Sequence, residues 1–146
     1  MSESADNPPT AAWPDERGDA LRSPDVRAFA IGSGLGRIAI GVGLAFAPRR
    51  ALAVLGFEDS PSVLAVSRLA GGRDIVIGAL TLAAMDDAES LRVASLASAA
   101  VDAGDAATFG ASLLSGAGPR EAAWRGLAAA VPATLAGLWV ARRLSR

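Results

Sequence analysis

Six charged side chains lie inside otherwise apolar stretches of this chain, and their chemistry is the most informative feature of the sequence. They are three arginines and three aspartates: Arg37, Arg68, Arg73, Asp74, Asp102 and Asp105. Aspartates accept hydrogen bonds or exchange protons, and guanidinium groups hold carboxylates, other anions or carbonyl groups. Charges within apolar helices are costly and normally have a function. We therefore take these residues as candidates for a ligand-binding site or for ion pairs in the core.

The residue types that the chain lacks exclude many other kinds of site. The sequence contains no His, Cys, Tyr or Lys. This excludes thiol and Ser-His nucleophiles, Schiff-base chemistry, a P-loop, and haem or zinc held by histidine. The net charge is −1 and no basic patch is interleaved with aromatic residues, so nucleic-acid binding is not expected. Neither a metal nor a cofactor is expected.

Four long apolar segments must position these charges, and they carry recognisable helix-start signals. Ser-Pro at 23–24 and at 60–61 supplies an N-cap followed by a proline suited to the first helical position. Asp86 and Glu89 have the spacing of a capping box before the third segment. Helices are expected over these ranges: about 24–48, 61–85, 88–115 and 119–143.

The segments favour an all-α fold, an antiparallel bundle of four transmembrane helices. Residues 23–146 would form this domain, and residues 1–22, rich in Pro, Asp, Glu and Ser, would form a disordered N-terminal tail. Each segment holds roughly 21 to 27 residues, enough to span a hydrocarbon core of about 30 Å. The alternative is a soluble, Ala-rich four-helix bundle, which would show a polar stripe that the first and fourth segments lack.

The distribution of arginines predicts the orientation in the membrane. More arginines lie near segment ends on the side that carries both termini, so both termini are expected in the cytoplasm. The acidic, Pro-rich start does not resemble a cleavable signal peptide. The expected location is therefore the inner (plasma) membrane, as a multi-pass protein.

Because the segments alternate in direction, residue number also predicts depth in the bilayer. All of the six charged residues except Asp105 and Arg68 would lie within a few Å of the midplane, at about 1.5 Å per residue. An unpaired charge there costs about 2.5 to 3.5 kcal/mol, so pairing is close to compulsory. The expected pairs are Arg37 or Arg73 with Asp102, Arg68 with Asp105, and Asp74 shared between arginines.

Two readings of this charged layer stay open. Ion pairs could fix which helices pack together, or a polar cavity could open where Gly71, Gly72 and Gly104 leave space beside the charges. Gly32 and Gly36 share one helix face and permit close approach of another backbone. A homo-oligomer or hetero-oligomer through that face is therefore a further expectation.

A resemblance to a known family rests on Arg37 in a Gly-rich segment, on Phe-Ala-Pro48 at its end, and on the run Arg68-Leu-Ala-Gly-Gly-Arg73-Asp74-Ile-Val-Ile-Gly78. Over about residues 27–143 the chain resembles a family of small four-helix bacterial membrane proteins of unknown function. The resemblance implies a fold and a membrane location but no activity. Basic residues that are all arginine, with abundant Ala and Gly, suggest a GC-rich, actinobacterial type of source.

Three hypotheses for the function follow. The first is a binding or accessory protein in the lipid bilayer, whose arginines would hold an anionic or carbonyl group of a small lipid-soluble ligand. The second is an isomerase or cyclase of a lipid-soluble substrate with a core aspartate as general acid, although flanking arginines favour the ionised carboxylate. The third is a structural subunit of a larger membrane complex.

Overall fold

The computed structural model describes residues 16–145, and within this range all regular secondary structure is helical. The helices in chain order are α1 (Glu16–Arg22), α2 (Pro24–Phe46), α3 (Pro48–Leu55), α4 (Pro61–Ala83), α5 (Ala88–Ser115) and α6 (Arg120–Arg143). The all-α class is confirmed. The four long helices, α2, α4, α5 and α6, occupy the four predicted segments.

The first long helix ends earlier than predicted, and a short helix follows it. α2 ends at Phe46, and Ala47 adopts a non-helical conformation with φ −128° and ψ 50°. Pro48 then begins α3, because proline fits the first helical turn, where its missing N–H costs nothing. Leu52 is buried on one side of α3, and Gly56 ends the helix at φ 83°, in the left-handed region that glycine adopts without strain.

The predicted disordered tail, residues 1–22, overlaps α1. Residues 1–15 lie outside the described residues, whereas residues 16–22 are helical. Ala20 and Leu21 of α1 pack against an apolar cluster that includes residues of α2 and α5. A helix this short is marginal alone, so the tertiary contact explains why this part of the prediction differs from the structure.

Side-chain caps begin two of the long helices. At α4, Ser60 Oγ accepts a hydrogen bond from the Val63 backbone N–H at 3.3 Å. At α5 the cap is Asp87 rather than the predicted Asp86, since its Oδ1 accepts from the Ser90 backbone N–H at 2.7 Å. These bonds satisfy amides that have no partner within the first helical turn.

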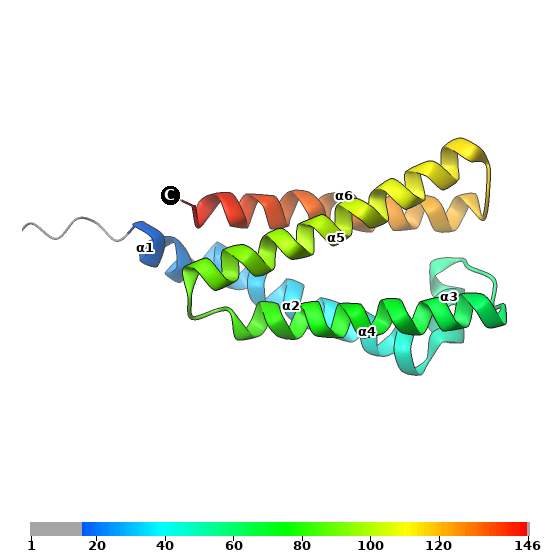
Figure 1. Ribbon diagram of the computed structural model, residues 1–146, viewed down its shortest axis with the longest axis horizontal. Helices are drawn as coiled ribbons and strands as arrows, with labels where there is room; N and C mark the ends of the chain where they lie inside the picture. Colours follow the sequence, from blue (N-terminus) through cyan, green and yellow to red (C-terminus); the bar gives the residue numbers. More distant parts are fainter. Residues whose placement is uncertain (1–15, 146) are drawn as a thin grey trace, which may run out of the picture.

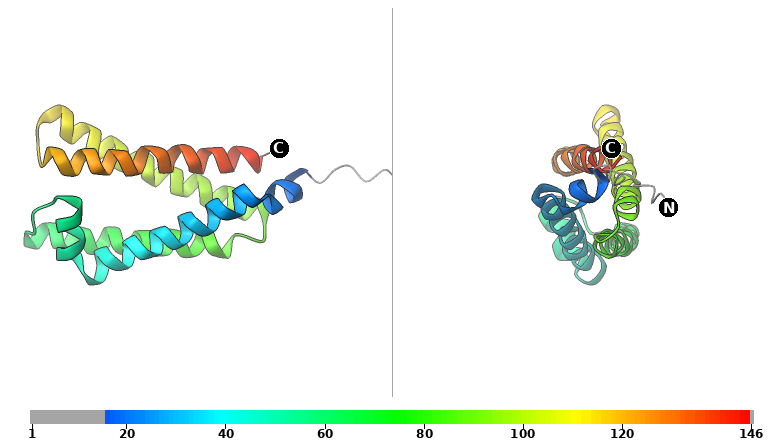
Figure 2. Two further views of the ribbon diagram at one scale, coloured as in Figure 1. Left: turned by 180° about the vertical axis from the view of Figure 1, so that it is seen from behind. Right: turned by 90° about the vertical axis from the view of Figure 1, so that its left-hand side faces the viewer.

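The long helices form two antiparallel pairs, α2 with α4 and α5 with α6 (Figure 1). α5 runs obliquely: it starts beside the end of α4 and moves away from α4 toward its own C-terminus (Figures 1 and 2). The two pairs therefore lie close together at the end that carries α1 and the C-terminus, and they spread apart toward the end that carries α3.

Glycines bring α2 and α4 into direct backbone contact. A Cβ added to Gly41 would lie 2.6 Å from the carbonyl oxygen of Gly71. One added to Gly78 would lie 2.5 Å from the carbonyl oxygen of Gly34. Larger residues at these positions would push the helices apart, so the four glycines define the α2/α4 interface.

The glycine face that the sequence favoured for a close contact is a different one. A Cβ on Gly32 or Gly36 would meet nothing within 4 Å. Within the chain these two glycines make no close helix contact, and the oligomer expected through them stays a prediction.

Contacts at both ends join the two helix pairs. Near the C-terminus lies an apolar cluster formed by Val26, Ala30, Ala84, Leu91, Val140 and Leu144. At the end that carries α3, Arg125 Nη1 donates to the carbonyl oxygen of Val54 at 2.7 Å. The ring centroids of Phe57 and Phe109 lie 6.3 Å apart at the same end. Charged side chains connect the pairs between these two ends.

By length and composition, one helix among the described residues, α2, is apolar enough to cross a membrane. A signal sequence, or the core helix of a soluble protein, meets the same criteria. The predicted four membrane spans are therefore not established by composition.

The buried side of α4 is polar or small, whereas its exposed side is apolar. Its buried residues are Ser67, Gly71, Asp74, Gly78 and Thr81. Large apolar side chains of the same helix face outward, among them Leu69, which is 75% exposed. Soluble proteins normally show the opposite pattern.

Candidate functional site

Arg37 lies at the centre of the charged residues and connects three helices. From α2, its Nη1 donates to Oδ1 of Asp74 on α4 at 3.1 Å. Its Nη2 donates to Oδ2 of Asp102 on α5. The side chains of Arg37 and Asp74 are 12% exposed, and that of Asp102 is 10% exposed. One planar guanidinium thus directs separate donors to two buried carboxylates.

The close packing of α2 on α4 brings Arg37 within reach of Asp74. A Cβ added to Gly78 would lie 3.2 Å from Cβ of Arg37. Gly78 follows Asp74 by four residues, so the two share a helix face. A larger residue at position 78 would move the Arg37 side chain away from its partner.

Arg73 forms a second, more accessible group of contacts. Its Nη1 and Nη2 donate to Oδ1 and Oδ2 of Asp105 at 3.1 and 2.9 Å, the bidentate geometry that a guanidinium favours. Its Nη2 also lies 3.5 Å from Oδ1 of Asp74. Arg73 is 39% exposed and Asp105 is 35% exposed. Asp74 is therefore shared between a buried and a half-buried arginine.

We refer to these five residues, Arg37, Arg73, Asp74, Asp102 and Asp105, as the ion-pair network. The network contains two arginines and three aspartates, so it carries one excess negative charge when every group is ionised. A buried carboxylate without its own cation is a position that a proton or a cation would neutralise. Chemically, the network can join helices or take up one positive charge.

The structure joins five of the six candidate residues and leaves Arg68 apart. The pairing of Arg37 with Asp102 and the sharing of Asp74 agree with the predicted pairs. The predicted pair of Arg68 with Asp105 is wrong, because Asp105 binds Arg73. Arg68 precedes Arg73 by about 7.5 Å along the helix axis. At that level α5 has already moved away from α4 (Figure 1).

Buried hydroxyl groups add to the polar interior, and sequence reasoning did not single them out. Ser67 Oγ donates to the carbonyl oxygen of Leu44 at 3.3 Å, across the α2/α4 interface. Ser95 Oγ is buried without a hydrogen-bond partner among the described residues. Ser95 and Ser98 precede Asp102 at helical spacing, and this spacing was the available signal that all three face inward.

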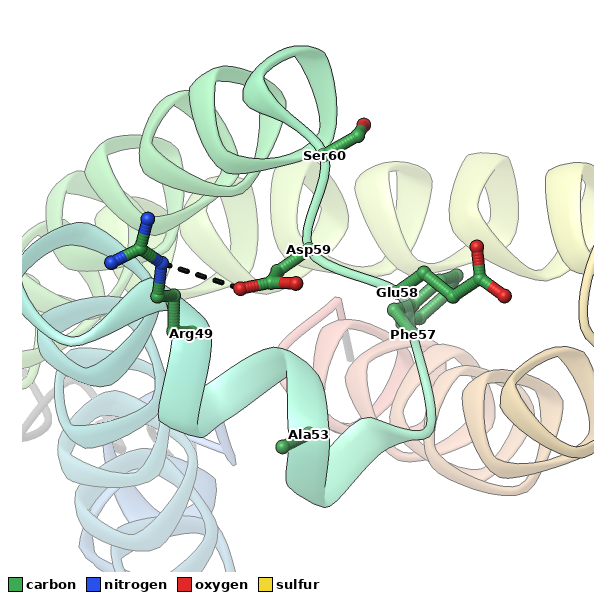
Figure 3. Close-up of a pocket in the computed structure, with 6 residues that line it drawn as sticks. All are labelled: Arg49, Ala53, Phe57, Glu58, Asp59 and Ser60. Atoms are coloured by element: carbon green, nitrogen blue, oxygen red, sulfur yellow. Dashed lines mark ion pairs between the residues drawn. The ribbon is translucent and has the colours of Figure 1, made fainter.

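Two surface hollows lie beside α3, and residues of the ion-pair network line neither of them. The first, of about 510 Å³, includes Arg49, Glu58 and Asp59 (Figure 3). Arg49 Nε lies 3.2 Å from Asp59 Oδ2 there. The second, of about 480 Å³, is lined by Arg50 and Arg68 together with Arg49.

The sequence predicted space beside Gly71, Gly72 and Gly104 for a central cavity. The backbone of α2 fills the space beside Gly71, since a Cβ there would lie 2.5 Å from the carbonyl oxygen of Gly41. A Cβ on Gly72 or Gly104 would meet nothing within 4 Å. The polar cavity among the charges stays a prediction.

Comparison with known proteins gives a family without an assigned activity. Residues 34–140 match the family described as "Domain of unknown function (DUF4267)". No curated protein and no solved structure shows a significant match to the chain. The matched range covers α4 and α5 completely and includes every residue of the ion-pair network.

Proposed function

Because the chain belongs to the DUF4267 family, whose description names no activity, we propose a function from the physical properties of the chain. We propose an integral inner-membrane protein that crosses the bilayer four times, with α2, α4, α5 and α6. In this proposal it acts as an accessory membrane protein, and the ion-pair network joins its two helix pairs.

The inverted pattern of burial carries the membrane proposal. Leu69 and Leu80 of α4 are exposed while Ser67, Asp74 and Thr81 are buried. On α5, Val93 and Leu96 are exposed while Ser95, Ser98 and Asp102 are buried. In water this arrangement would leave much apolar surface uncovered, whereas in lipid it satisfies both classes of side chain.

The charged residues of α4, α5 and α6 make these helices less apolar than α2 but do not oppose this proposal. The central charges of α4 and α5 have partners within the network: Arg73, Asp74, Asp102 and Asp105. Arg68 has no ion-pair partner among the described residues, but it lies within two turns of the start of α4, where its long side chain can reach the membrane surface. On α6, residues 126–141 carry no charge, and the arginines lie at the helix ends, where they can reach the membrane surface. Paired or terminal charges cost far less in a bilayer than isolated central ones.

The arginine donors of the ion-pair network are already used in hydrogen bonds to aspartates, which favours an architectural role over catalysis. Both terminal nitrogens of Arg37 already bind carboxylates, and Arg73 binds Asp105 through two hydrogen bonds. Each core aspartate already accepts a hydrogen bond from an arginine, so no carboxyl group of the network is left without a protein partner to serve as the general acid that an isomerase would need. Joining α2 and α4 to α5 is the task that this geometry performs best.

Cysteine labelling in intact cells tests the topology, because the chain has no native cysteine. Single cysteines would replace Glu58 and Ala117 at one end of the bundle, and Asp86 and Ser145 at the other. A membrane-impermeant maleimide should label the first two, and label the other two only after permeabilisation. Resistance of the protein to carbonate extraction should accompany this result.

Equal labelling of all four positions in intact cells or in unbroken spheroplasts would contradict four spans with both termini in the cytoplasm. Labelling of all four in denaturant is the control for reactivity. Release of the protein by carbonate would contradict membrane integration itself.

A second candidate function is binding of a small lipid-soluble ligand at the network, favoured by the partial exposure of Arg73 and Asp105. Mass spectrometry of the natively purified protein, compared with Asp102→Asn, separates the two functions. Architecture predicts identical spectra without ligand and a less stable variant. A bound molecule that disappears in a variant of unchanged stability would instead support ligand binding.

A further inference from the structure

The hollow of about 480 Å³ beside α3 has a lining that is both basic and apolar. Three arginines contribute to it, Arg49 and Arg50 from α3 and Arg68 from α4. Phe46 and Leu64 form part of its apolar wall. No acidic residue lines this hollow, in contrast to the neighbouring hollow, which contains Glu58 and Asp59.

The arginines retain donors for a ligand. Arg49 uses Nε to bind Asp59 at 3.2 Å, and its two terminal nitrogens point away from that carboxylate (Figure 3). Arg50 and Arg68 form no ion pair with any residue between 16 and 145. Three positive charges around one hollow repel one another, and a bound anion would relieve this repulsion.

Contacts with α2 hold α4, the helix that carries Arg68. Ser67, next to Arg68, donates to the carbonyl oxygen of Leu44, close to the end of α2. The backbone contact between Gly71 and Gly41 lies one turn further along α4. The backbone at Arg68 is therefore held before any ligand arrives, which reduces the entropic cost of binding.

We propose that this hollow binds a phosphate group, carried either by a lipid headgroup or by a soluble compound. A phosphate offers several acceptor oxygens to guanidinium donors, and arginine forks match its geometry. Phe46 and Leu64 would contact the apolar or neutral part of the molecule that carries the phosphate. The site is separate from the ion-pair network and does not depend on the number of membrane spans.

Calorimetric titration of the full chain in a nonionic detergent tests the site with three probes. The probes are inorganic phosphate, dioctanoyl phosphatidylglycerol, and dioctanoylglycerol, which has the same chains without phosphate. Arg50→Gln/Arg68→Gln should weaken phosphate-dependent binding about tenfold or more, because two charge-assisted contacts are lost. The control Arg27→Gln/Arg120→Gln removes the same charge elsewhere and should bind within about twofold of the wild type.

The probes also identify the source of the phosphate group. Binding of phosphatidylglycerol alone supports a lipid headgroup, and binding of inorganic phosphate supports a soluble compound. Absence of binding by both, equal binding of dioctanoylglycerol, or equal losses in the two double variants would overturn the proposal.

Chemical footprinting of the wild-type protein tests the same site without any substitution that could affect folding. Phenylglyoxal modifies accessible arginines, and peptide mass spectrometry reports each position. The bound probe should protect Arg50 and Arg68 but leave Arg27 reactive. Unchanged modification of Arg50 and Arg68 at saturating probe would also overturn the proposal.

Discussion

Asp74 is the residue on which the two halves of the ion-pair network meet. Both Arg37 and Arg73 direct a terminal nitrogen to the same oxygen, Oδ1, at 3.1 and 3.5 Å. Asp105, in contrast, contacts Arg73 alone and is half-buried. Neighbouring carboxylates of one network therefore differ in what their removal would cost.

The substitution Asp74→Ala should lower the free energy of unfolding by about 3 kcal/mol, because it leaves a buried guanidinium short of a partner. Asp105→Ala should lower it by no more than about 1 kcal/mol, since water screens the more exposed pair. Thermal and denaturant unfolding in detergent micelles measures both. Equal losses in the two variants would contradict the shared role of Asp74.

At the scale of single helices, backbone groups at a few positions make the contacts that hold each helix in place. The α2/α4 pair depends on glycines that touch the facing backbone, and α5 begins at an aspartate cap. Each contact concerns one helix or one helix pair, so each can be tested by a substitution outside the ion-pair network.

Gly41→Ala should destabilise the α2/α4 pair by about 1 to 3 kcal/mol, because its Cβ would lie 2.6 Å from the facing Gly71 carbonyl oxygen. Gly32→Ala is the matched control on the same helix, and its Cβ would meet nothing within 4 Å. It should be neutral or stabilising by up to about 1 kcal/mol, since alanine favours helix. Unfolding curves of both variants measure the difference. A larger destabilisation by Gly32→Ala than by Gly41→Ala would contradict the α2/α4 interface described above, because it would mean that α2 packs through the face that carries Gly32.

The cap at the start of α5 predicts a specific pH dependence. Hydrogen bonds from Ser90 lower the pKa of the Asp87 carboxyl below its ordinary value of 3.8. The stabilisation from this cap is therefore complete above pH 3.8 and is lost as the pH falls through the lowered pKa of the folded state. The difference in Tm between wild type and Asp87→Ala should be constant near neutral pH and shrink in strong acid.

Asp86→Ala serves as the control for this pH series, because Asp86 precedes the capping position and caps no helix. Its difference in Tm from the wild type should be small at neutral pH. A larger effect at Asp86 than at Asp87 would indicate that Asp86 caps α5, as the sequence predicted.

At the scale of the whole molecule, two helix pairs are joined by an apolar cluster at one end, by charges in the middle, and by Arg125 and Phe57 at the other end. Because α5 runs obliquely, the two pairs lie closest at the end that carries this apolar cluster (Figure 2). Leu144 lies in that cluster with no exposed surface.

Leu144→Ala should lower the free energy of unfolding by about 2 to 5 kcal/mol, since it leaves a cavity where the helix pairs meet. Leu114→Ala, at a side chain that is 92% exposed, is the matched control and should change stability by no more than about 0.5 kcal/mol. Circular dichroism melts in detergent compare the two. Similar effects at both positions would indicate that the cluster does not hold the pairs together.

The sequence by itself determined the four long helices, the all-α class and the inventory of chemistry. The predicted helix ranges lie within two residues of the observed ones, because Pro, Gly and capping signals act through local hydrogen bonds and backbone angles. The charged candidates could be identified from the sequence, because a charged residue such as Arg37 or Asp102 within an apolar run stands out whatever the fold. Residue number also predicted which charges share a level along the bundle, because helical rise is nearly constant.

Only the tertiary structure decided which of these residues touch. Pairing of Asp105 with Arg73 rather than Arg68 follows from the divergence of α5 from α4, and a helix crossing direction is not written in either helix alone. The choice of Gly41 over Gly36 for the close contact likewise depends on the face that the partner helix covers. Short helices such as α1 gain their stability from packing. Local signals fix each helix, whereas contacts between distant segments fix the site.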